Sequence, residues 1–138
     1  MAKSVRDLMS SNPRSVSVDA TVVDAAQLMR DEDVGLVPVV DGDRLVGTVT
    51  DRDITIRVLA EQKDPKSTNV REIASTDLVT IDPQQDLDEA LRLMAQHQVR
   101  RLPVVEEDGR LVGIVAQADV ARESDDARTG ELVEQISK

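Results

Sequence analysis

Polar side chains with the chemistry to bind a ligand stand at two points of the sequence. Thr50 and Asp53 lie three residues apart, between a β-branched run and a helical pattern. A Thr-x-x-Asp spacing is typical of a helix N-cap, where the hydroxyl and the carboxylate each bond to a free backbone N–H. The residues alone therefore favour a capping role for this pair.

The second point is a basic pair, Arg100 and Arg101, which precedes an apolar run that begins at Leu102. Two exposed arginines on an acidic surface are a common arrangement with little effect on stability. Guanidinium groups also match phosphate oxygens in a bidentate geometry. The single histidine, His97, lies just before the pair, where it is expected to end a helix or to pack as a polar side chain.

Nothing in the sequence indicates an enzyme. There is no G-x-x-x-x-G-K-S/T phosphate loop, no G-x-S-x-G elbow and no H-E-x-x-H zinc motif. Cysteine is absent and histidine occurs once, so a thiol nucleophile or a multi-histidine metal site cannot form. The acidic residues fall at expected caps, turns and exposed helix positions. We expect no catalytic residue, no metal and no required cofactor.

Composition narrows the class of protein further. The 138 residues are 40% hydrophobic and 32% charged, which is typical of a globular chain. The absence of aromatic residues and a formal net charge of -10 disfavour nucleic acid and anionic membranes as partners. No apolar stretch approaches the ~20 residues of a membrane span, and the first residues lack a signal core. We expect a cytoplasmic location.

The strongest pattern is an internal repeat. Three segments return 65 residues later (5 to 70, 25 to 90, 37 to 102), and a fourth returns 66 residues later (44 to 110) because the second turn is longer. The pairs are Val5–Met9 with Val70–Ala74, Ala25–Met29 with Ala90–Met94, Val37–Val40 with Leu102–Val105, and Arg44–Gly47 with Arg110–Gly113. Four matches in register indicate a duplication.

Periodicity predicts strand–helix–strand–strand–helix in each repeat. Apolar residues at i, i+3, i+4 and i+7 mark the first helix, which is capped by Thr21 with Asp24 or by Asp86 with Glu89. The other expected elements are short strands at Ser15–Val18 and Val79–Ile81, hairpins of Leu36–Val40 with Arg44–Val49 and of Leu102–Val105 with Leu111–Val115, turns at Asp41-Gly42 and Asp108-Gly109, and second helices at Asp51–Ala60 and Gln117–Arg122.

This pattern predicts an α/β protein of two packed repeats. A three-stranded sheet with helices on one face leaves an apolar face that a second repeat can cover. We expect repeat one with its lead-in at 1–62, a linker at 63–69, repeat two at 70–123 and a polar tail at 124–138. The tail carries Leu132, Val133 and Ile136, which either dock on the module or a second subunit, or fray.

Four sequence segments of the chain resemble the cystathionine-β-synthase (CBS) domain family. These are Leu36-Val37-Pro38-Val39-Val40, Gly47-Thr48-Val49-Thr50-Asp51-Arg52-Asp53, Val99-Arg100-Arg101-Leu102-Pro103-Val104-Val105 and Gly113-Ile114-Val115-Ala116-Gln117-Ala118-Asp119. The likeness runs from Val5 to Arg122 and is greatest to small stand-alone bacterial CBS pairs, including hypoxic response proteins. It implies a pseudo-twofold pair of repeats packed through their sheets and commonly dimerised. Its inter-repeat clefts often bind AMP, ADP, ATP or S-adenosylmethionine.

The resemblance also implies roles for individual residues. At Thr50 and Asp53 it favours ligand binding over helix capping, and the two side chains would hold the ribose and phosphate region of a nucleotide. A carboxylate suits this role because it accepts two hydrogen bonds from a vicinal diol. Arg100 and Arg101 would contact phosphates. The full set expected for this cleft is Ser15 and Val16 (backbone to adenine), Val37 and Pro38 (apolar edge against the base), Thr50, Arg52, Asp53, Arg100 and Arg101.

The second repeat departs from the family pattern. Asp119 is kept, but Ala116 replaces Thr50, and Gln117-Ala118 replaces Asp51-Arg52. A second cleft with Val79, Pro103 and Asp119 is therefore expected to bind more weakly or not at all. The sequence thus predicts a homodimeric, non-catalytic sensor of an adenosyl ligand, acting on an unidentified effector protein. The alternative is a ligand-free interaction or stress-response protein that acts through its dimer surface.

Overall fold

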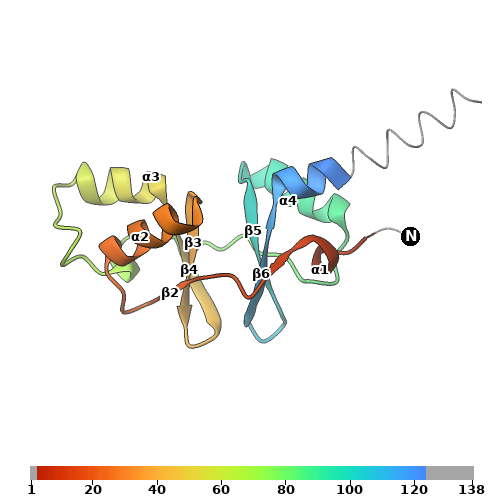
Figure 1. Ribbon diagram of the computed structural model, residues 1–138, viewed down its shortest axis with the longest axis horizontal. Helices are drawn as coiled ribbons and strands as arrows, with labels where there is room; N and C mark the ends of the chain where they lie inside the picture. Colours follow the sequence, from red (N-terminus) through yellow and green to blue (C-terminus); the bar gives the residue numbers. More distant parts are fainter. Residues whose placement is uncertain (1–2, 124–138) are drawn as a thin grey trace, which may run out of the picture. The chain divides into compact units, whose positions relative to one another are not determined.

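The computed structural model describes residues 3–123, which pack as two compact units. The first unit comprises residues 12–78 and 105–111. The second unit comprises the described residues within 1–11, 79–104 and 112–138. Each unit contains one three-stranded sheet together with its helices (Figure 1).

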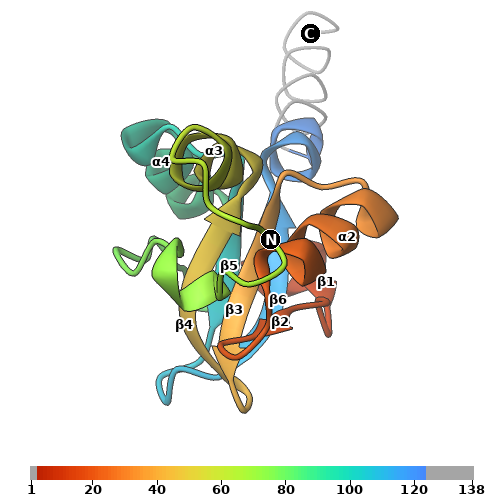
Figure 2. The same ribbon diagram turned by 90° about the vertical axis from the view of Figure 1, so that its left-hand side faces the viewer.

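The sheet of the first unit has the order β2-β3-β4. The strands are β2 (Val16–Ser17), β3 (Leu36–Asp41) and β4 (Arg44–Thr50), seen side by side in Figure 2. β2 runs parallel to β3, with Val16 opposite Val39, and β3 pairs antiparallel with β4. Gly42 turns this hairpin with a φ of 68°, a conformation that costs glycine little.

Two helices of the first unit lie on one side of this sheet (Figure 1). α2 (Val22–Glu32) begins at the N-cap Thr21 and ends at Asp33, whose φ of 54° is left-handed. α3 (Asp51–Ile54) begins at Thr50 and continues as a π-helical segment, η1 (Thr55–Leu59). The helix expected over 51–60 is present, but its second half has a wider turn than the sequence predicts.

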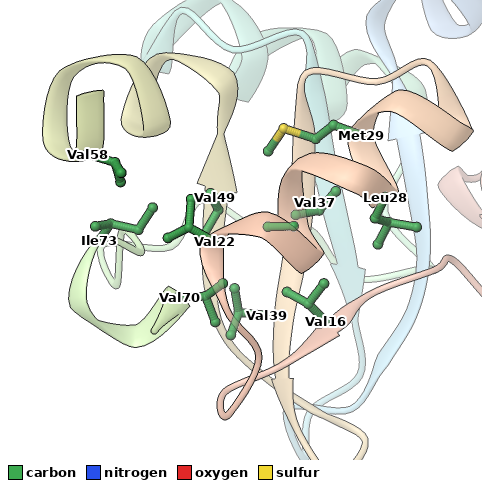
Figure 3. Packing of buried hydrophobic residues seen from close by; sticks show 11 residues of the cluster. Val16, Val22, Leu28, Met29, Val37, Val39, Val49, Val58, Val70 and Ile73 are labelled. Atoms are coloured by element: carbon green, nitrogen blue, oxygen red, sulfur yellow. The ribbon is translucent and has the colours of Figure 1, made fainter. Parts of the chain in front are cut away.

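The core of the first unit is built almost wholly from aliphatic side chains (Figure 3). Ile73 points toward Val49 and Val58, while Val70 lies beside Val39. The buried members are Val16, Val22, Ala25, Leu28, Met29, Val37, Val39, Val49, Val58, Val70 and Ile73. Because no aromatic residue is available, β-branched side chains on the strands and helices fill the space between them.

The second unit also has a three-stranded sheet, with the order β1-β6-β5, but its third strand, β1, pairs antiparallel with the second strand of the hairpin. Its strands are β1 (Ser10–Ser11), β5 (Arg101–Val105) and β6 (Leu111–Ala116), and its long helix is α4 (Leu87–His97). The expected strand at Val79–Ile81 is reduced to one parallel bridge between Ile81 and Val104. Residues 117–123 are helical up to the last described residue.

The first helical segment of each repeat, its lead-in segment, packs in the unit that holds the strands of the other repeat. α1 (Val5–Leu8) belongs to the second unit, where the Val5 N–H donates to the Gln85 carbonyl at 2.8 Å. Its counterpart η2 (Val70–Glu72), a 3₁₀ helix, belongs to the first unit, where the Val70 N–H donates to the Ala20 carbonyl at 2.9 Å. Division by packing therefore differs from division by sequence repeat.

Thr68 is the one buried residue of the expected linker, 63–69, whose other residues are exposed or half-buried. Thr68 is 6% exposed, and its carbonyl accepts a hydrogen bond from the Val22 N–H at 2.9 Å. The mixed α/β class and the two similar repeats are confirmed, whereas the apolar residues of the expected tail, Leu132, Val133 and Ile136, lie outside the described residues. Within residues 3–123, no helix combines the length and apolar character of a membrane span.

Candidate functional site

Thr50 and Asp53 form a reciprocal pair where β4 passes into α3. The Asp53 N–H donates to Thr50 Oγ1 at 3.1 Å, and the Thr50 N–H donates to Asp53 Oδ2 at 2.9 Å. The Asp53 side chain is 16% exposed, and its Oδ1 lies 3.8 Å from Arg57 Nε. The predicted cap is therefore present, and it fixes the direction of a carboxylate that still has acceptor positions to spare.

Arg57 was not predicted as a neighbour of this carboxylate. Its position four residues after Asp53 on a helix was the available signal, because i, i+4 pairs lie on one face. The Arg57 guanidinium also donates from Nη1 to the Ile73 carbonyl at 3.0 Å. The guanidinium thus contacts both the Asp53 carboxylate and the Ile73 carbonyl, and a ligand at Asp53 would meet a partly neutralised carboxylate.

The start of α3 is tied to the start of β3. The Asp51 N–H donates to the Gly35 carbonyl at 3.0 Å, and a Cβ on Gly35 would lie 3.1 Å from Asp51 Oδ2. Arg52 is exposed, and its guanidinium makes no hydrogen bond or ion pair with another residue of 3–123. It is available to an anion near Thr50 and Asp53.

The other residues expected in the first cleft lie on β2 and β3. Ser15 is half-buried just before β2, Val16 packs in the core, and Pro38 pairs with Thr48 across the β3–β4 ladder. Val37 is only 1% exposed and belongs to the core cluster. Its side chain packs inside the first unit, which the sequence did not indicate because an uninterrupted apolar run does not reveal which residues face the helices.

The second unit lacks the reciprocal cap. Ala116 ends β6 in the place of Thr50, and Asp119 Oδ1 instead accepts from Arg122 Nη2 at 3.1 Å. Pro103 lies on β5, where its carbonyl accepts from the Ile81 N–H at 3.1 Å, and Val79 packs against the core. The carboxylate is present but is not directed by a neighbouring hydroxyl.

Arg100 and Arg101 stand at the start of β5. Arg100 is exposed, Arg101 is half-buried, and neither guanidinium is paired with any residue that the structure describes. The Arg100 carbonyl accepts from the Gln117 N–H at 2.7 Å, as the Gly35 carbonyl accepts from Asp51 in the first unit. Within the second unit, the basic pair is thus tied to the helical turn that carries Asp119. His97 is the last residue of α4, as predicted.

The clear pKa shifts fall on exposed ion pairs away from these residues. A hydrogen bond from the Arg92 guanidinium lowers the pKa of Glu89, and the Arg92 pKa is raised in return. Over residues 3–123, no group of three or more His, Asp or Glu side chains could hold a metal ion. The described residues thus include one directed carboxylate, that of Asp53 in the first unit, and guanidinium groups without a described partner in each unit.

Comparison with known proteins identifies the repeats. The CBS domain family model matches residues 5–60 and 70–126. CBS domain-containing protein YhcV of Bacillus subtilis is 47% identical over 118 residues, covering 86% of this chain and 83% of that protein. Hypoxic response protein 1 of Mycobacterium tuberculosis is 44% identical over 118 residues, covering 85% and 82%. None of these matches indicates a catalytic family.

Solved structures share the fold. Hypoxic Response Protein I with two coordinated zinc ions is 43% identical, with a TM-score of 0.80 over 87% of this chain and 98% of that chain. The CBS domain pair of MJ0100, in complex with 5-methylthioadenosine and S-adenosylmethionine, is 26% identical, with a TM-score of 0.81 over 92% and 99%. CBSX2 in complex with AMP is 29% identical, with a TM-score of 0.76 over 91% and 98%.

Proposed function

Because this chain belongs to the CBS domain family, we propose that it is a regulatory module that binds an adenosyl ligand at Thr50 and Asp53. The observation that carries the proposal is the reciprocal Thr50–Asp53 pair, with its 2.9 and 3.1 Å hydrogen bonds, at the end of β4. It holds a carboxylate in one direction, so that a ribose diol would meet a preorganised acceptor. Two similar solved CBS pairs hold AMP or S-adenosylmethionine.

We do not propose zinc binding for this chain, although the solved Hypoxic Response Protein I structure contains two coordinated zinc ions. This chain has no cysteine and one histidine, and residues 3–123 contain no group of three or more potential metal ligands. The ligand we propose is therefore an adenosyl compound, with AMP, ADP, ATP and S-adenosylmethionine as the panel to test.

Arg100 and Arg101 are proposed to neutralise phosphates of such a ligand. Their guanidinium groups have no partner within the described residues and match phosphate oxygens well. The sequence assigns them to the ligand at Thr50 and Asp53. The 2.7 Å bond from the Gln117 N–H to the Arg100 carbonyl favours a ligand at Asp119 instead. The two assignments differ in whether ligand binding is lost in Asp53→Ala or in Asp119→Ala.

Calorimetry with the four adenosyl compounds tests the proposal. Asp53→Ala should abolish binding, whereas Asp53→Asn should weaken it while keeping an oxygen for the Thr50 N–H. Asp119→Ala is the matched control in the other repeat. If Asp119→Ala and Arg100→Gln remove the same binding while Asp53→Ala does not, the arginine pair serves the second repeat and the Thr50–Asp53 assignment is wrong.

The second candidate function is an interaction protein without a ligand, acting through a dimer surface. Two large apolar side chains on η1, Ile56 and Leu59, are 49% and 61% exposed and favour some contact surface there. A flat titration with every adenosyl compound would support this alternative. Native mass spectrometry of protein purified from cells would then show whether it is a homodimer and whether an effector protein is retained.

A further inference from the structure

The first unit holds a pocket at the turn end of the β3–β4 hairpin, away from Thr50 and Asp53. Its volume is about 290 Å³, near the lower end of small-molecule pockets. The walls are aliphatic or bare backbone, formed by Val18, Val39, Val46, Gly47 and Ala74. Every one of these residues belongs to the first unit. An apolar group of a few carbons fits these walls.

One difference between the two repeats lies in the wall of this pocket. The second unit has Met9 in the place of Ala74, and Gly113 in the place of Gly47. A Cβ on Gly113 would lie 2.5 Å from Met9 Sδ and 2.9 Å from its Cγ, so the methionine side chain covers that glycine. A Cβ on Gly47 meets only one side-chain atom, the Ala74 Cβ at 3.2 Å. The space that Met9 fills in one unit is left open in the other.

Charged groups of both signs line the same pocket. Arg71 donates from Nη2 to Asp19 Oδ1 at 2.5 Å and from Nε to the Val18 carbonyl at 3.3 Å, which leaves Nη1 without a hydrogen bond to residues 3–123. Asp19 is 79% exposed, so this ion pair is weak and screened. Asp41 is exposed and makes no ion pair within the described chain. A guanidinium and a carboxylate are therefore both open to a ligand.

Aliphatic walls beside one cation and one anion match one class of molecule. We infer that this pocket binds a free α-amino acid with an aliphatic side chain. The side chain enters between Val18 and Val46, the carboxylate pairs with Arg71, and the ammonium pairs with Asp41. The inference is independent of the adenosyl proposal, since it uses none of the same residues.

The test is an NMR titration of protein carrying ¹³C-labelled valine methyl groups. L-Leucine should shift the methyl signals of Val18, Val39 and Val46 in a saturable way, and glycine, which lacks the side chain, should not. Ala74→Met copies the other repeat and should abolish the shifts. Ala26→Met, the same replacement at an exposed position of α2, is the matched control and should leave them intact.

A second variant keeps the test decisive even if Ala74→Met perturbs the fold. Arg71→Gln changes an exposed side chain and should weaken leucine binding about tenfold. The affinity of Arg71→Gln for 3-methylbutylamine, which lacks the carboxylate, should equal that of the wild-type protein. Absence of leucine-dependent shifts in the wild-type protein, or equal leucine affinity in Arg71→Gln, would overturn the inference. Asp53→Ala should leave the shifts intact, so that failure of the adenosyl proposal is seen separately.

Discussion

The two units have nearly the same framework but different polar edges. In the first unit, Thr50 and Asp53 bond reciprocally and direct one carboxylate. In the second, Ala116 provides no hydroxyl, and Asp119 pairs with Arg122 at 3.1 Å instead. The duplicated apolar pattern preserved the fold, whereas single substitutions at strand ends changed what each unit can bind.

The same lesson holds at the opposite end of the hairpins. Met9 covers Gly113 in the second unit, while Ala74 leaves a pocket of about 290 Å³ in the first. Each difference removes a few atoms without disturbing a strand or helix. Binding capacity in this protein is therefore set residue by residue on a common scaffold.

The lead-in segments give the largest expected effect. Ile73 is fully buried in the first unit, and Ile73→Ala should lower the free energy of unfolding by about 3 kcal/mol through a core cavity. Urea denaturation measures the loss. Hydrogen exchange should show faster amides within 12–78.

Val5→Ala truncates a core residue of the other lead-in segment. Val5 is 0% exposed in the second unit, so a smaller loss of about 2 kcal/mol is expected. In this variant, amide hydrogen exchange should become faster within 79–104, although Val5 belongs to repeat one in sequence. Faster amide hydrogen exchange confined to 12–62 would contradict the packing of Val5 in the second unit.

Gly47 and Gly113, which occupy matching positions in the two units, should show an intermediate loss of stability when replaced by alanine. Gly113→Ala should cost about 2 kcal/mol, because the new Cβ would meet Met9 Sδ at 2.5 Å and the Ser10 carbonyl oxygen at 3.0 Å. Gly47→Ala should cost less, since its contacts are 3.1 Å to the Ser75 carbonyl oxygen and 3.2 Å to the Ala74 Cβ. Thermal unfolding of both variants measures the difference.

Met9→Ala combined with Gly113→Ala provides the control for that pair. Removing the thioether should recover part of the Gly113→Ala loss but not all of it, because the Ser10 carbonyl remains 3.0 Å from the new methyl. Equal losses for Gly47→Ala and Gly113→Ala would show that Met9 moves aside freely, and the contrast between the open pocket beside Gly47 and the covered Gly113 would then be wrong.

The smallest effect belongs to the caps. Thr50→Ala removes the hydroxyl that accepts from the Asp53 N–H and should cost about 1 kcal/mol, whereas Thr50→Ser should cost only a few tenths. Ala116→Thr should stabilise the second unit by up to about 1 kcal/mol if Asp119 leaves Arg122 to complete a reciprocal cap. Chemical denaturation compares the three variants, and no gain for Ala116→Thr would mean that Arg122 holds Asp119 too firmly.

The sequence by itself determined the features that depend on near neighbours. Thr21, Thr50 and Asp86 cap helices as their spacing predicts, and Gly42 and Gly109 adopt positive φ at the predicted turns. Helix periodicity and turn chemistry are local, so a single copy of the repeat carries them. Alignment of the two repeats likewise shows that repeat two has Ala116 at the position that matches Thr50.

Only the tertiary structure decided which side chains are available. The uninterrupted run Val37–Val40 does not show that Val37 is buried, and the repeat does not show that Val5 and Val70 each pack in the unit of the other repeat. The open pocket beside Ala74 depends on whether a distant side chain reaches over Gly47. These outcomes rest on contacts between residues far apart in the chain, which local pattern and spacing do not encode.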